Sequence, residues 1–161
     1  MPLRPNAVGA AIKKYGLKSD FLFWAGMACA EDTMIGALLA TDPALVRQAS
    51  SSEQQRVRKI LRDILPVSLR AKGLMNDAQL AGTPKPMALE SIRVPTLEIS
   101  VEDDRFQTAA AARHIARSVA GAKLIIYPSG GHIFVGHATE LFKEVATFLA
   151  EVQAGIASEK E

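Results

Sequence analysis

The chain has 161 residues, 48% of them hydrophobic, and a formal net charge of +2 at pH 7. This length predicts one domain with a sizeable core, and the hydrophobic content excludes an intrinsically disordered chain. So small a charge, without a basic stripe, argues against nucleic acid as a partner, and no apolar run is long enough for a membrane-spanning helix. The segment MPLRPNAVGA makes a poor secretory signal, and the single cysteine fits a reducing compartment, so we expect a cytoplasmic protein.

Residues 1–80 predict a series of helices and no strand. Capping residues or prolines mark five helix starts: Ser19, Thr33, Asp42-Pro43, Ser50 and Pro66. We expect the aromatic run FLFW (21–24) to pack in a core, with the lining of a lid pocket as the alternative. Cys29 is expected to be a small buried side chain.

The pattern changes after residue 80. Residues 81–95 contain three prolines and predict a linker. A strand (96–101), a helix (108–119), a second strand (123–127) and a final helix (about 139–153) follow, with a polar tail at 154–161. This β-α-β-α order predicts an α/β fold with two parallel strands joined by a right-handed crossover.

Side chains able to do acid–base chemistry follow both predicted strands. Asp103 and Asp104 follow the first strand, and His132 follows the second, after two glycines. Parallel strands end at the same edge of a sheet, about 4.8 Å apart when they are neighbours. We therefore expect a carboxylate to hydrogen-bond one imidazole nitrogen and to leave the other free as a general base. His137 is expected at a helix start or at a pocket rim and not in a zinc site, because no further ligands cluster around it.

The sequence around these residues resembles that of a known family. IRVPTLEISVEDDRF, followed by SVAGAKLIIYPSGGHIFVGH, looks like the C-terminal end of the α/β-hydrolase superfamily, and LPVSLRAKGLMND is similar to part of the lid in one branch. The resemblance runs from about residue 17 to 152 and implies Asp104 as the triad acid, with Asp103 as the alternative, and His132 as the triad histidine. It implies no cofactor. Val101, where a small residue is usual, and Glu98, within a strand that is usually apolar, depart from the family pattern.

The family nucleophile is missing from the sequence. The family carries it in a G-x-S-x-G elbow upstream of the lid, and no such pattern occurs here. Ser129 lies in the loop that carries His132, too close to the histidine in sequence to be the elbow serine. No oxyanion-hole motif is found. The resemblance therefore implies a partial α/β-hydrolase fold: a helical lid (1–80), a linker (81–95), the last β-α-β-α of the core (96–153) and a tail (154–161).

Two functions are compatible with this reading. In the first, the chain supplies the acid and histidine for hydrolysis of a small ester, amide or carbon–carbon substrate, and is inactive without the half that carries the nucleophile. In the second, it is a non-catalytic remnant or binding module of the same fold. Two strands alone make an incomplete sheet, so we expect self-association or a partner chain.

Overall fold

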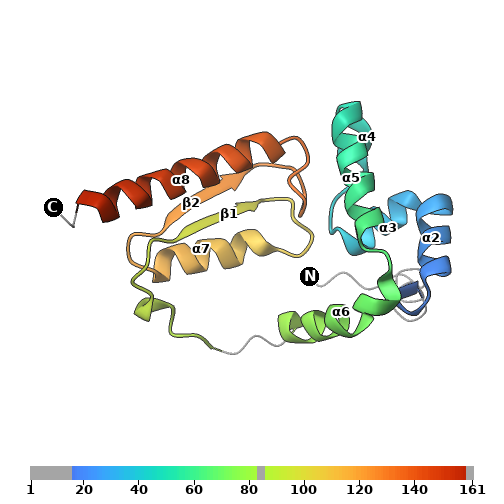
Figure 1. The fold of residues 1–161 in the computed structure, drawn as a ribbon, viewed down its shortest axis with the longest axis horizontal. Coiled ribbons are helices and arrows are strands. Elements are labelled where there is room, and N and C mark those ends of the chain that lie inside the picture. Colours follow the sequence, from blue (N-terminus) through green and yellow to red (C-terminus); the bar gives the residue numbers. More distant parts are fainter. Residues whose placement is uncertain (1–15, 83–85, 159–161) are drawn as a thin grey trace. The chain divides into compact units, whose positions relative to one another are not determined.

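The chain divides into two compact units. The computed structural model describes residues 16–82 and 86–158, and the units are Met1–Pro86 and Met87–Glu161 (Figure 1). Length alone predicted one domain. The division falls within the proline-rich stretch, where missing backbone N–H groups prevent a continuous helix or strand. Residues 83–85 of the predicted linker lie outside the described residues.

The first unit is helical, and its described residues contain no strand. Its elements are η1 (Gly16–Lys18), α2 (Asp20–Cys29), α3 (Glu31–Leu38), α4 (Pro43–Gln48), α5 (Ser51–Asp63) and α6 (Val67–Gly82). The predicted caps at the starts of α2 and α5 are confirmed: the Ser19 hydroxyl accepts from the Leu22 N–H at 3.3 Å, and the Ser50 hydroxyl accepts from the Glu53 N–H at 3.3 Å. The predicted cap at Thr33 is wrong by three residues, because α3 begins at Glu31 and its N-cap is Ala30.

The core of this unit uses only part of the apolar run in α2. Phe23 is buried, whereas Phe21 and Trp24 are more than half exposed, so the prediction that the aromatic run packs in the core holds for one of its rings. A run that is apolar all round has faces that a single neighbouring core cannot cover. Cys29 lies at the end of the same helix and is exposed, which corrects the expectation of a buried thiol.

Within the described residues no single helix is long and apolar enough to cross a membrane. The pair α2 and α3 reaches the required length and hydropathy only when taken together, and the chain bends by 115° between the two helices.

The second unit is the predicted β-α-β-α arrangement. It contains η2 (Leu89–Ser91), β1 (Leu97–Val101), α7 (Thr108–Ser118), β2 (Lys123–Tyr127) and α8 (Ala138–Ser158). The strands pair in parallel, in a register that runs from Leu97 opposite Lys123 to Val101 opposite Tyr127. The fold is therefore mixed α/β, as predicted. The final helix is longer than expected: it continues to Ser158, through most of the predicted polar tail.

The two helices of this unit flank the two-stranded sheet (Figure 1). Side chains alternate across the sheet, so Lys123 and Tyr127 share one face, where Lys123 pairs with Glu151 of α8 and Tyr127 stacks on His137 just before α8. Ser100 lies on the other face and hydrogen-bonds Thr108 at the start of α7. The carboxyl ends of both strands, with the loops that follow them, thus lie at one edge of the sheet.

Candidate active site

The structure brings together the two residues that the sequence placed at the strand ends. Asp104 follows β1, His132 follows β2, and His132 Nδ1 lies 3.0 Å from Asp104 Oδ2. The predicted contact between this carboxylate and this imidazole is therefore present. The two side chains differ sharply in accessibility: the Asp104 side chain is 1% exposed and that of His132 is 42% exposed.

A hydrogen-bond network orients the buried Asp104 carboxylate. Oδ1 accepts from the Phe106 N–H at 2.8 Å, and Oδ2 accepts from the Thr108 hydroxyl. Because Thr108 gives its only hydroxyl proton to Asp104, the Ser100 hydroxyl at 2.8 Å must donate to Thr108 Oγ1. Burial tends to raise the pKa of Asp104, but the hydrogen bonds from Thr108, His132 and Phe106 outweigh it, so the pKa lies below its ordinary value.

The imidazole of His132 is held on one side and open on the other. The Phe106 ring packs edge-on against it, with ring centroids 4.9 Å apart at 79°. When Nδ1 carries the proton and donates it to Asp104, Nε2 presents a lone pair. No described residue hydrogen-bonds Nε2, so this nitrogen is placed to accept a proton from an approaching group.

The loop that carries His132, residues 128–137, is the histidine loop. Gly130 and Gly131 both have positive φ (136° and 59°), which glycine adopts at low cost. Their N–H groups donate to Asp103, Gly130 to Oδ2 at 3.2 Å and Gly131 to Oδ1 at 2.8 Å. Asp103, the alternative triad acid, therefore binds backbone N–H groups of the histidine loop and does not contact the ring. The carboxylate that contacts the histidine ring is that of Asp104.

Other candidates from the sequence lie around this centre. His137 directly precedes α8, as predicted, and its ring stacks on Tyr127 with centroids 4.3 Å apart. Burial, together with the charges of Glu140 and Glu144, raises the pKa of Tyr127. Across the described part of the chain, no three His, Cys, Asp or Glu side chains form a group able to hold a metal ion.

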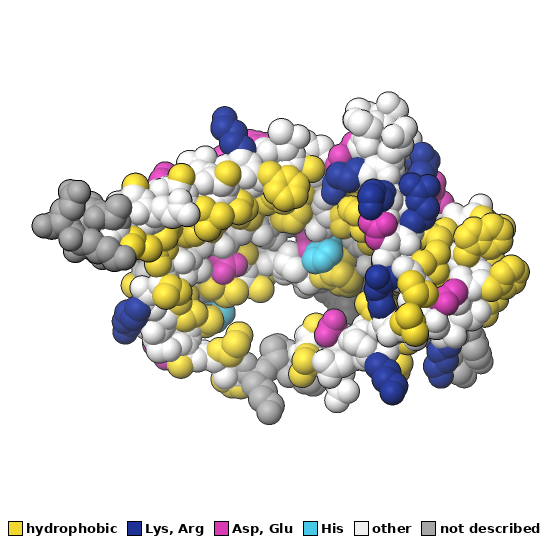
Figure 2. Space-filling view, viewed as in Figure 1, with side chains coloured by type: hydrophobic (Ala, Val, Ile, Leu, Met, Phe, Trp, Pro, Cys, Tyr) yellow, Lys and Arg dark blue, Asp and Glu magenta, His cyan; other side chains and the backbone are white. Residues whose placement is uncertain are grey.

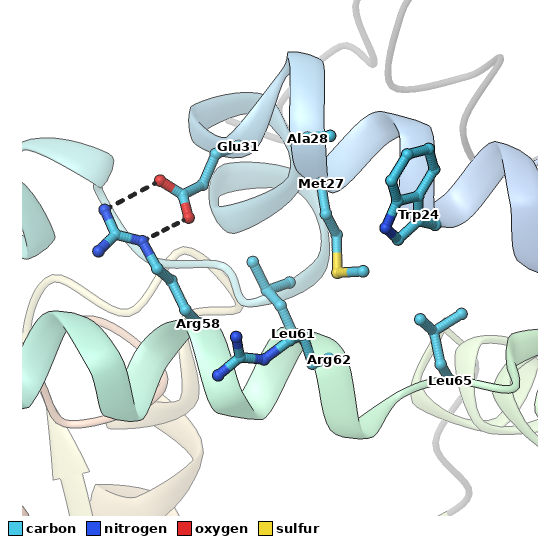
Figure 3. Close-up of a pocket in the computed structure, with 8 residues that line it drawn as sticks. All are labelled: Trp24, Met27, Ala28, Glu31, Arg58, Leu61, Arg62 and Leu65. Carbon is cyan, nitrogen blue, oxygen red and sulfur yellow. Dashed lines mark hydrogen bonds and ion pairs between the residues drawn. The ribbon is translucent and has the colours of Figure 1, made fainter.

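A separate cavity lies entirely within the helical unit. It has a volume of about 300 Å³ and is drawn in Figure 3, lined by Trp24, Met27, Ala28, Glu31, Arg58, Leu61, Arg62 and Leu65. The Arg58 guanidinium donates to the Glu31 carboxylate at one end, at 2.8 and 3.3 Å, and this pairing raises the pKa of Arg58. Trp24 thus lines a pocket, which was the alternative interpretation of the aromatic run.

Sequence reasoning missed three features of the site. Thr108 was expected to start a helix, which it does, but its hydroxyl also binds Asp104 four residues earlier. The contact from the Phe106 N–H to Asp104 is an Asx turn, which an aspartate directly after a strand already favours. The edge contact of the Phe106 ring with His132 joins two loops and carries no sequence signal.

The chain matches no family model, no curated protein and no solved structure. The residues of the site provide a buried, ionised carboxylate bound to a half-exposed imidazole, which is the arrangement of an acid–base pair.

Proposed function

We propose that this chain is the C-terminal part of an α/β-hydrolase and supplies the acid, Asp104, and the base, His132, of a Ser-His-Asp triad. The observation that carries the proposal is the 3.0 Å contact between His132 Nδ1 and the buried Asp104 carboxylate, with Nε2 facing away from it. A buried carboxylate of lowered pKa stays ionised at neutral pH and favours the imidazolium that forms during proton transfer.

The chemistry follows from the two ring nitrogens. Nε2 takes the proton of a serine hydroxyl as its oxygen attacks the substrate carbonyl, and then gives that proton to the leaving group. Water then attacks the acyl group on the serine, gives its proton to Nε2, and the proton returns to the serine oxygen as the acid product leaves. Asp104 holds Nδ1–H throughout and fixes the tautomer. Small esters, amides or activated carbon–carbon bonds fit this scheme, which needs no cofactor. The serine and the oxyanion donors have to come from a polypeptide segment that lies outside these 161 residues.

Exposed apolar side chains on α8 support the proposal that the second unit binds a partner chain. Phe142 is 72% exposed and Leu149 is 54% exposed, on one face of α8, and Figure 2 shows hydrophobic side chains along this helix. A parallel sheet usually has more than two strands, and both of its faces are usually covered. We propose that the chain bearing the nucleophile, or a second copy of this chain, covers this face in the cytoplasm.

The test is reconstitution. The coding region directly upstream is read for a G-x-S-x-G elbow, and its product is co-expressed with this chain and assayed on a p-nitrophenyl ester. We expect ester hydrolysis that falls by about 10³-fold or more with His132→Ala. The matched control is His114→Ala, on an exposed position of α7.

Two outcomes would contradict the proposal. The first is the absence of an elbow upstream together with no turnover. The second is turnover that His132→Ala leaves unchanged. Assembly of the two segments without any turnover would favour the non-catalytic binding module.

A further inference from the structure

The histidine loop has a backbone conformation that needs support. Gly130, Gly131 and Phe134 all have positive φ, and for Phe134, at 55°, this is unfavourable. A Cβ on Gly130 would lie 3.3 Å from Phe134 Cα and from Val135 N, so the backbone folds tightly on itself. Within the loop, the Val135 N–H donates to the Gly130 carbonyl at 2.7 Å.

The support for the start of the loop comes from the other strand. Asp103 directly precedes the triad acid, and its two carboxylate oxygens each accept one N–H, from Gly130 and from Gly131. Both glycines are buried, so an N–H left without an acceptor there would be costly. These two hydrogen bonds connect the segment after β1 to the two residues that directly precede His132.

We propose that Asp103 is a positioning residue, which holds His132 against Asp104 by fixing the N–H groups of Gly130 and Gly131. The two adjacent carboxylates then divide the work: Asp104 binds the imidazole ring, and Asp103 binds the backbone that carries it. Both are needed to set the 3.0 Å contact, because a ring on an untethered loop samples other positions. The meaning of this contact for catalysis rests on the proposed function, but the tether itself does not.

The aromatic contacts of the loop do not replace this tether. Tyr127 packs edge-on against Phe134, with centroids 6.2 Å apart, and stacks on His137. These contacts hold the part of the loop that follows His132, and the N–H groups of Phe134 and Val135 donate to the carbonyls of Gly131 and Gly130 at 3.0 and 2.7 Å. The N–H groups of the two glycines themselves are bound by Asp103.

The experiment is NMR on the full, isotope-labelled chain. It measures the resonance of the His132 Nδ1 proton and the hydrogen exchange of the Gly130 and Gly131 amides. With Asp103→Ala we expect these two amides to exchange about tenfold faster, as for the loss of one charged hydrogen bond, and the Nδ1 proton signal to broaden or disappear. Asp103→Asn keeps one acceptor oxygen and should restore part of both signals.

A control variant and a set of reference amides make the result decisive. Glu102→Ala removes the neighbouring carboxylate, which is exposed and pairs with Arg113, and it should change neither signal. The amides of the β1–β2 ladder should keep their exchange rates in all variants. The proposal is overturned if Asp103→Ala leaves the Nδ1 proton unchanged, if Glu102→Ala has the same effect, or if the ladder amides accelerate as much as those of the two glycines.

This readout is separate from catalysis. If reconstitution gives no ester hydrolysis while Asp103→Ala still releases the loop and the ring, the proposed function fails and the positioning role stands. If hydrolysis is found and the NMR signals do not respond to Asp103, the reverse holds.

Discussion

Replacing Asp104 with alanine tests the network at the centre of the site. The carboxylate accepts from the Phe106 N–H, the Thr108 hydroxyl and His132 Nδ1. The imidazole is half-exposed and water can replace its partner, but the two other donors are partly buried. Leaving each of them unsatisfied costs about 1–3 kcal/mol, so we expect Asp104→Ala to lower the free energy of unfolding by about 3 kcal/mol.

Urea denaturation followed by circular dichroism at pH 7 measures this change. With a urea dependence of about 2 kcal/mol per molar, the unfolding midpoint should fall by about 1.5 M. Glu102→Ala is the control, because it removes an exposed carboxylate from the same turn, and its midpoint should move far less. An Asp104→Ala midpoint equal to that of Glu102→Ala would refute the reasoning.

The same variant predicts a pH dependence with a definite sign. The pKa of Asp104 in the folded chain lies below its ordinary value of 3.8, so the folded state binds the proton less readily than the unfolded state. The stabilisation is fully present above pH 3.8 and is lost as the pH falls through the lower, folded pKa. The difference in midpoint between wild type and Asp104→Ala should therefore shrink as the pH falls below 3.8.

Three further predictions concern other parts of the second unit and the missing nucleophile. Burial raises the pKa of Glu98, so folding is opposed by its ionisation above its ordinary pKa of 4.5; Glu98→Gln should raise the urea midpoint at pH 7 but not at pH 3, and an equal change at both pH values would exclude this cause. The exposed face of α8 should make the chain self-associate at micromolar concentration, and the double change Phe142→Glu and Leu149→Glu should shift light scattering towards the monomer mass; a wild type that is already monomeric and binds no apolar dye would contradict this. A fluorophosphonate probe should label no serine of the isolated chain, since none lies in a nucleophile elbow. Stoichiometric labelling of Ser129, seen by mass spectrometry, would contradict the proposal that the nucleophile lies on another segment.

Local sequence signals were sufficient for most of the secondary structure. The second strand was predicted with its observed bounds, Lys123–Tyr127, and Ser50 caps α5 as its spacing to Glu53 indicated. Such features depend on residues within a few positions of one another, so they can be predicted from the local sequence. The end of α8 was missed because Gly155, two residues after the predicted end, does not stop the helix, whose last turns continue to Ser158.

Part of the site followed from the same local signals and one topological rule. Strands joined by a single helix run in parallel, so the residues after both strands meet at one edge. This rule predicts Asp104 beside His132, as the structure has them. The choice between two adjacent acids did not follow from that rule. Both carboxylates were within reach of the histidine loop as far as the sequence could tell.

The tertiary structure decided what each acid contacts and which apolar residues are covered. Successive side chains after a strand point in different directions, so Asp104 turns to the imidazole and to Thr108, while Asp103 meets the N–H groups of the glycines across the sheet edge. The same holds for burial: Phe23 is enclosed and Trp24, the next residue, is 55% exposed. Composition sets how much apolar surface a chain has, but only the packing of elements that are distant in sequence sets which part of it leaves water.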